Sequence, residues 1–213
     1  MIKGCLVLLI GLISAAFPGD WAIVTLNDFP EYAHAGTPLK LTFTVRKHGQ
    51  TPVPGLRPSV RATTAGGQTA KSDAAPGRGR GEYTTTIALP QPGQWTITIA
   101  SGFNDTTLSL PSLKVIPPGD AAPDRFSPVT RGLRLFASKG CVGCHRHIEV
   151  NPGKAVDAKL DLTGKRFPQD SLKKFLADPG IKPLDMPNLN LKNDEIDALA
   201  AFINKSASKT IEK

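Results

Sequence analysis

Residues 81–99 read GEYTTTIALPQPGQWTITI and carry the clearest structural signal in the sequence. Apolar and polar residues alternate on both sides of residues 90–93, which read PQPG. Alternation with a period of two is typical of half-buried strands, and a Pro- and Gly-rich break between two such runs is typical of a turn. The stretch therefore predicts two strands that pair as a hairpin.

The same alternation recurs through the first half of the chain. Turn signals at 52–55 (PVPG) and 65–67 (AGG) separate the runs. Six or seven short strands at this spacing predict an antiparallel β-sandwich of the immunoglobulin type. The expected strands are 21–26, 39–46, 59–64, 82–89, 94–100 and 107–116.

The first sixteen residues are expected to be a secretory signal peptide. Lys3 supplies a basic start, residues 5–13 are an unbroken apolar run, and residues 14–16 (SAA) are the small residues that a signal peptidase accepts. The apolar stretch is much shorter than the roughly 20 residues of a spanning helix, which favours cleavage over a retained membrane anchor. The mature chain is therefore expected in the periplasm or another extracytoplasmic space.

Composition and charge narrow the function further. Hydrophobic residues make up 40% and charged residues 21% of the 213, which excludes wholesale disorder. The net charge of +8 suits an acidic partner, but export argues against nucleic acid. Residues 17–116 contain neither Met nor Cys and only two histidines, His34 and His48, a poor ligand set for copper. This half is expected to be a docking or positioning module without catalysis of its own.

Only two cysteines remain after the signal peptide, Cys141 and Cys144, and they stand in CVGCH at 141–145. The pattern C-x-x-C-H is the covalent attachment site of a c-type haem, in which both thiols become thioethers and the next histidine, His145, binds the iron. A thioredoxin-like redox pair would need a βαβ context, and zinc would need two further ligands, of which only His147 is close. We therefore expect one covalently bound haem c.

Helical patterns surround this motif. Ser127 followed by proline predicts a helix start, with an apolar stripe that ends at Gly140. A second helix is expected over 169–178, and a third begins at 193–195 (NDE), where acidic residues suit the positive end of a helix. Three short helices predict a small all-α unit.

Met186 is the only methionine after Met1, and prolines at 183 and 187 flank its loop. Because these prolines stiffen the loop, Met186 is the predicted sixth ligand of the iron. The alternative use of a methionine is to fill a gap in an apolar core. His147 could compete, but it follows His145 by only two residues and would struggle to reach the opposite face.

Residues from about 125 to 205 thus resemble a class I cytochrome c. The matches are Gly132 and Phe136, CVGCH at 141–145, MPNL at 186–189 and LAAFI at 199–203. The resemblance implies that the first and last helices cross near Gly132, with Phe136 and Phe202 at the contact. It also implies that a proline carbonyl, for which Pro152 is the nearest candidate, accepts the hydrogen on Nδ1 of the proximal histidine.

Residues 81–99 also resemble the paired strands of the FixH-like and related periplasmic β-sandwich domains. Together these features predict two domains, an N-terminal all-β immunoglobulin-like sandwich and a C-terminal all-α cytochrome c fold. The expected boundaries are a signal peptide at 1–16, the sandwich at 17–116, a linker at 117–124, the cytochrome c domain at 125–205 and a flexible tail at 206–213.

The expected function is the relay of single electrons, because His145 and Met186 fill both axial positions and leave no place for a small-molecule substrate. The protein is then no enzyme, and its partners are redox proteins, such as a membrane electron-transfer complex or a terminal oxidase. The alternative is a haem-based sensor or peroxidase-like enzyme in which Met186 is displaced. Basic residues expected to flank the haem and steer a partner are Lys139, Arg146, Lys165, Arg166, Lys173, Lys174 and Lys182.

Overall fold

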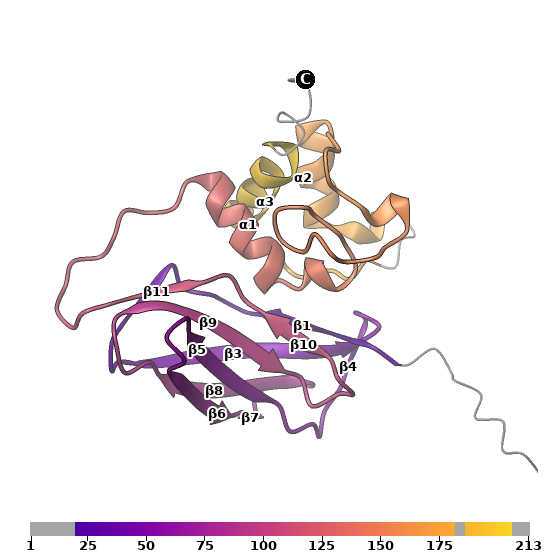
Figure 1. The fold of residues 1–213 in the computed structure, drawn as a ribbon. Coiled ribbons are helices and arrows are strands. Elements are labelled where there is room, and N and C mark those ends of the chain that lie inside the picture. The colour runs from indigo at the N-terminus through magenta and orange to yellow at the C-terminus, as the bar shows by residue number, and fades with distance from the viewer. Residues whose placement is uncertain (1–19, 182–185, 206–213) are drawn as a thin grey trace, which may run out of the picture.

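The computed structural model describes residues 20–181 and 186–205. Within these residues the fold is mostly β: two sheets pack face to face, and three α-helices lie on one side of them (Figure 1). The predicted signal peptide at 1–16 and tail at 206–213 lie outside the described residues. No helix in the described part of the chain has the length and apolar character needed to cross a membrane.

One sheet has the strand order β1-β3-β8-β7, with β4 paired to β3, and the other has the order β2-β11-β9-β5-β6, with β10 paired to β9. The paired strands are antiparallel, except for β11 and β2, which are parallel. The strands are β1 (Ala22–Leu26), β2 (Tyr32–His34), β3 (Pro38–Lys47), β4 (Thr51–Pro52), β5 (Ser59–Thr64), β6 (Thr69–Asp73), β7 (Ala75–Pro76), β8 (Glu82–Ala88), β9 (Gly93–Ala100), β10 (Thr107–Ser109) and β11 (Leu113–Ile116).

The core between the sheets follows the alternation in the sequence. Phe43 of β3 lies opposite Tyr83 of β8, and both side chains are fully buried with Trp95 of β9 from the other sheet. Because successive side chains of a strand point to opposite faces, every second residue of these strands enters this core. The prediction of a β-rich N-terminal half is therefore confirmed.

The predicted hairpin at 81–99 is wrong. β8 pairs with β3 and β7 in one sheet, whereas β9 pairs with β5, β10 and β11 in the other. Pro90 and Pro92 have no N–H to donate to a ladder between the two strands. The indole Nε1 of Trp95 donates to the Gln91 carbonyl at 2.9 Å, and this bond ties the corner where the chain crosses between the sheets.

The α-helices are α1 (Pro128–Ser138), α2 (Gln169–Ala177) and α3 (Asn193–Lys205), and three single 3-10 turns accompany them at Cys141–Gly143, Ala158–Leu160 and Pro179–Ile181. The Ser127 hydroxyl caps α1 by accepting from the Thr130 amide at 3.2 Å. α1 packs against α3 so closely at Gly132 that a Cβ atom there would collide with the Ala198 carbonyl. Phe136 and Phe202 meet beside this crossing, with ring centroids 5.7 Å apart.

The prediction of two domains, with a compact all-α cytochrome c fold at 125–205, is wrong. The fold is mostly β, and its few helices form a layer on the sheets. The Arg134 guanidinium of α1 donates to the Ser112 carbonyl at 2.7 Å and to the Pro30 carbonyl at 2.9 Å. Val142 packs against both the sheet core and the helical core, so the two cores share a boundary. Helical periodicity alone does not show that charged residues of a helix are buried against a sheet.

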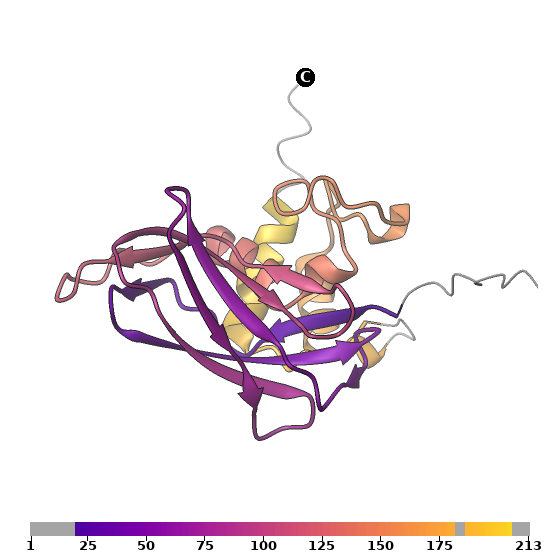
Figure 2. The same ribbon diagram turned by 60° about the horizontal axis from the view of Figure 1, so that its bottom comes forward.

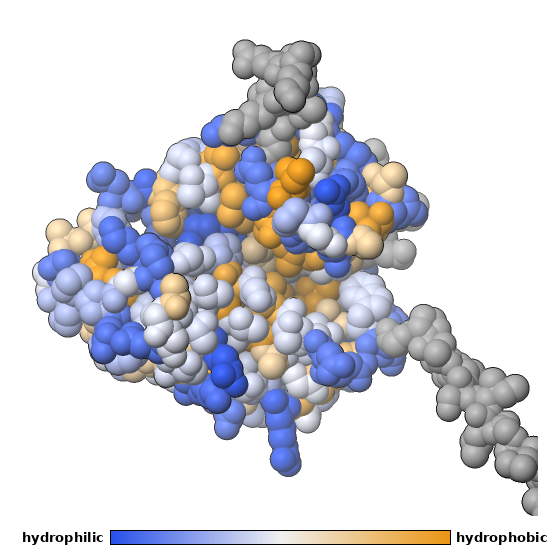
Figure 3. Space-filling view, in the orientation of Figure 1, coloured by the Kyte–Doolittle hydropathy of each residue, from blue (hydrophilic) through white to orange (hydrophobic). Residues whose placement is uncertain are grey.

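The helices cover one open side of the sandwich. α1 lies against β1 and β10, which are at the edges of the two sheets, and the turn Cys141–Gly143 also contacts β1 (Figures 1 and 2). An uncovered edge strand presents unpaired backbone groups to other chains, and a helix laid over it blocks such pairing. In Figure 3 hydrophobic surface gathers where the helices meet the sheets, and the lower part of the sandwich is mainly hydrophilic or neutral.

Candidate functional site

Cys141 begins the 3-10 turn that follows α1, Cys141–Gly143, and Cys144 is the residue directly after it. Gly140 has a φ of +81°, which reverses the chain and starts this turn. The amides of Cys144 and His145 both donate to the Cys141 carbonyl, at 3.1 Å and 2.8 Å. Both thiols are free and partly exposed. The turn thus holds two thiols and an imidazole within five consecutive residues.

The two thiols are protonated at neutral pH. Burial raises the pKa of the Cys141 thiol to about 12, and burial also raises the pKa of Cys144. Among the described residues, no group of three or more His, Cys, Asp or Glu side chains is arranged to hold a metal ion.

His145 is oriented by a backbone carbonyl. Its Nδ1 lies 3.1 Å from the Leu160 oxygen, and burial lowers the pKa of the imidazole, so the ring is neutral near pH 7. This contact assigns the hydrogen to Nδ1 and leaves the lone pair on Nε2. The expected acceptor, Pro152, is wrong: its carbonyl instead accepts from Nε of Arg146 at 3.1 Å.

The segment that carries Leu160 is fixed by polar contacts. Arg146 forms an ion pair with Asp161. Its backbone also bonds on either side of Asp161: the Arg146 amide donates to the Leu160 carbonyl at 3.2 Å, and the Leu162 amide donates to the Arg146 carbonyl at 2.9 Å. Hydrogen bonds from Thr163, followed by those from Arg146, lower the pKa of Asp161 to about 2. Leu160 and Asp161 are site residues that sequence reasoning missed, because a carbonyl acceptor fifteen residues away leaves no local pattern.

Met186 packs against the same helical core as Cys141. This core contains Leu135, Phe136, Leu172, Leu176, Ile196, Ala198, Leu199, Ala200, Phe202 and Ile203. The structure therefore brings Met186 to the same apolar cluster as Cys141. The first flanking proline, at 183, lies outside the described residues.

His147, which could have competed for the iron, lies inside the helical core. Its ring is fully buried, 4.4 Å from the Phe202 ring and 5.9 Å from the Phe136 ring between centroids. Burial lowers the pKa of His147, and its Nε2 has no hydrogen-bond partner in the described part of the chain. His147 therefore packs in the core as a neutral ring against the two phenylalanine rings.

The expected ring of basic side chains is only partly exposed. Lys139 is buried and pairs with Glu195 at 2.8 Å, so it is not available to steer a partner. Arg146 pairs with Asp161, and Lys173 pairs with Asp197 at 2.7 Å. Lys182 lies outside the described residues. The sequence reports the charge of these residues but not the acids that neutralise them.

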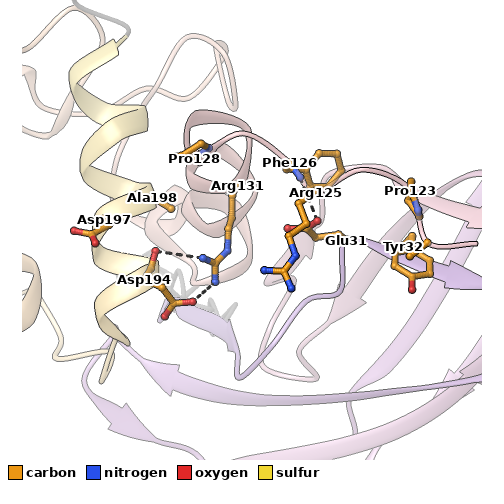
Figure 4. A pocket seen from close by; sticks show the side chains of 11 residues that line it. Glu31, Tyr32, Pro123, Arg125, Phe126, Pro128, Arg131, Asp194, Asp197 and Ala198 are labelled. Atoms are coloured by element: carbon orange, nitrogen blue, oxygen red, sulfur yellow. Dashed lines mark hydrogen bonds and ion pairs between the residues drawn. The ribbon is translucent and has the colours of Figure 1, made fainter.

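A groove of about 700 Å³ lies elsewhere, between residues 122–128, β2 and the first turns of α1 and α3 (Figure 4). Arg131 crosses it to Asp194 at 2.5 Å, and the Phe126 amide donates to Glu31 at 3.2 Å. None of Cys141, Cys144, His145 and Met186 lines this groove.

No curated protein was found to match the sequence. Among solved structures, a candidate glycoside hydrolase from Bacteroides vulgatus is 15% identical with a TM-score of 0.32, over 43% of this chain and 17% of its own. Domains 1–6 of the surface layer protein SbsC are 18% identical with a TM-score of 0.35, over 53% and 15%. A superoxide reductase (neelaredoxin) from Ignicoccus hospitalis is 16% identical with a TM-score of 0.30, over 46% and 82%. The chain thus spans less than a fifth of the length of the first two.

The family comparison concerns the sheets. The assignment of a class I cytochrome c joined to a FixH-like sandwich is wrong, because the family model that matches is a different one and lies over the β part of the chain. The part of the chain that does match is 20–100, which is similar to the family described as YtkA-like.

Proposed function

We propose that this protein is an exported electron-transfer protein that carries one haem, covalently attached through Cys141 and Cys144. The observation that carries the proposal is the turn at 141–145. Its two free thiols stand beside an imidazole whose Nδ1 is held by the Leu160 carbonyl. This donor set fits a c-type haem, for which two thiols and one histidine with a free Nε2 are the required protein groups.

The cysteines perform the attachment. Cys141 and Cys144 would hold the haem by thioether bonds: each thiol would add to one vinyl group, with a sulfur–carbon bond formed, the vinyl double bond made single and the thiol hydrogen passed to the other vinyl carbon. No atom or electron is lost from the pair of reactants. Because Cys141 and Cys144 are three residues apart and their backbones are joined by the Cys144 amide bond to the Cys141 carbonyl, one porphyrin edge could accept both thioether bonds.

His145 and Met186 are the residues that would bind the iron of such a haem. When bound, the haem supplies a one-electron couple between Fe(III) and Fe(II). The bond from Nδ1 to Leu160 increases the basicity of Nε2, and a thioether ligand favours the reduced state and raises the potential. Met186 and Cys141 both pack, partly buried, against the same apolar core.

With His145 and Met186 both bound to the iron, the haem would have no place for a small-molecule substrate and would exchange electrons with partner proteins. The partners we propose are a membrane electron-transfer complex or a terminal oxidase. The β-sandwich would serve as the docking or positioning part.

Two measurements test this proposal. Haem in the purified protein should stay with the denatured chain after extraction with acidified acetone, and the double variant Cys141→Ser with Cys144→Ser should lose it. The reduced spectrum should respond little to carbon monoxide, since a filled sixth position excludes it. Extractable haem would refute the attachment, and a full carbon monoxide shift would favour the sensor or peroxidase-like alternative.

A further inference from the structure

Ile23 of β1 has an unusual position for a buried strand residue. It is only 5% exposed, yet it belongs to neither the sheet core nor the helical core. Its neighbours Ala22 and Val24 are part of the sheet core. Because strand side chains alternate between faces, Ile23 points away from that core and toward the layer of helices.

The side chain of Ile23 fills the space beside the attachment turn. A Cβ atom built at Gly140 would lie 2.5 Å from Cγ2 of Ile23, and one built at Gly143 would lie 2.9 Å from Cγ1. Both distances are shorter than real Cβ contacts, so a side chain at either position would force Ile23 to move. At Gly140 the Val24 carbonyl, 2.6 Å from the same Cβ position, also excludes a side chain. The two glycines stand on either side of Cys141, and Gly143 directly precedes Cys144.

The same side chain also lies close to Pro187, the residue after Met186. A Cβ atom built at Gly49, in the turn after β3, would lie 3.1 Å from Cδ1 of Ile23 and 3.7 Å from Cγ of Pro187. Gly49 has a φ of +73°, a conformation that favours glycine. Ile23 and Pro187 thus approach the same small volume, and Pro187 is the residue after Met186.

We propose that Ile23 is a positioning residue that holds the attachment turn, residues 140–144, and the segment Met186–Pro187 in one packed unit. The sandwich then sets the geometry of the sixth ligand, which deepens the proposed function and rests on it. Neither core contains Ile23, so truncating it should disturb the site without dissolving the fold. The chemistry of attachment needs only the two thiols and should survive.

The test compares Ile23→Ala with Val24→Ala, its neighbour on the other face of the same strand. Covalent haem should be retained in both. Ile23→Ala should lose the weak near-infrared band of ferric iron bound to methionine, and its potential should fall. Its rate of cyanide binding should rise about tenfold, the change that 1.4 kcal/mol produces. Val24→Ala should lower stability but keep the band, and Ile23→Leu should restore wild-type behaviour.

A readout that does not depend on the haem completes the test. Amide hydrogen exchange in the full chain should become faster at 140–144 and at 186–190 in Ile23→Ala, and should stay near wild type there in Val24→Ala. Equal exchange and an unchanged band in Ile23→Ala would overturn the inference while covalent haem stands. Extractable haem in the wild type would instead refute the proposed function, and the exchange data would still decide whether Ile23 couples the two segments.

Discussion

A carbonyl oxygen and a thioether illustrate how single residues define the candidate site. The Leu160 oxygen fixes the tautomer of His145 from fifteen residues away, through a backbone pairing that Arg146 and Asp161 stabilise. Cys141, Cys144 and His145 could be picked out from the sequence because their spacing is a known motif. The Leu160 carbonyl could not be predicted in this way, because every residue has a backbone carbonyl and only the fold determines which one bonds to His145.

Met186→Ala tests the proposed sixth ligand directly. The variant should keep its covalent haem, lose the near-infrared band of the ferric state, and bind cyanide readily, because the methyl group of alanine cannot coordinate iron. Absorption spectra with and without cyanide provide the measurement. A variant that kept the band and still excluded cyanide would show that another residue is the ligand.

Glu82 carries a pH-dependent contribution to stability. Its carboxylate accepts from the Arg78 amide at 2.9 Å, from the Gly79 amide at 3.4 Å and from the Asn27 side chain at 3.4 Å. The Arg78 bond is the largest cause that lowers the pKa of Glu82 below its usual value of 4.5. A lowered pKa means that the stabilisation is present above that usual value and is lost as the pH falls through the lower folded-state value.

We therefore expect Glu82→Gln to be less stable than wild type near neutral pH, and the difference in free energy of unfolding to shrink as the pH falls below 4.5. Urea unfolding at several pH values measures it. Glu149→Gln, on an exposed carboxylate, serves as the control. A difference that stayed constant with pH would contradict the role given to the charge.

Elements were predicted well where the signals are local. The start of α1 follows from Ser127 and Pro128, and its end from Gly140. Strand pairing is different, because alternation reveals a strand but not its neighbour, and β8 and β9 went to different sheets. Residues 69–73 (TAKSD) contain no large apolar residue, so β6 had no alternation to detect.

The contact of α1 with α3 and the sheets depends on a buried ion pair. Lys139 donates to Glu195 at 2.8 Å and to the Asn27 carbonyl at 2.9 Å, and both charged side chains are less than 10% exposed. Removing one member of such a pair leaves the other charge buried without compensation, which costs about 3–5 kcal/mol.

Lys139→Met should therefore destabilise the protein by about 3–5 kcal/mol, and adding Glu195→Gln should recover much of that loss. Both free energies of unfolding come from urea titrations analysed as a double-mutant cycle. A loss below about 1 kcal/mol for Lys139→Met, the range of exposed ion pairs, would mean that the pair is solvated.

At the scale of the whole molecule, the helices and the sheets share charged groups that neither could satisfy alone. Arg134 is buried between the rings of Phe29 and Phe126, 4.6 Å and 5.0 Å from their centroids. It also donates to the carbonyls of Ser112 and Pro30. The sequence showed an apolar stripe on this helix and a change of pattern near residue 117, which favours two domains. The sequence could not show that the Arg134 side chain of α1 donates hydrogen bonds to carbonyls in the β part.

This shared interface predicts that the helices and the sheets unfold together. Both tryptophans, Trp21 and Trp95, lie in the β part, so their fluorescence reports the sheets, and the helical circular dichroism reports the other layer. The two thermal curves should coincide in the wild type.

Arg134→Met should leave the Ser112 and Pro30 carbonyls without their donor, lower the free energy of unfolding by about 2–4 kcal/mol, and separate the curves. Arg131→Met, on the same helix but in the exposed pair with Asp194, should cost at most about 1 kcal/mol and leave them coincident. If the wild type already showed two separate transitions, the helical layer would be an independent unit, and Arg134 would not couple its unfolding to that of the sheets.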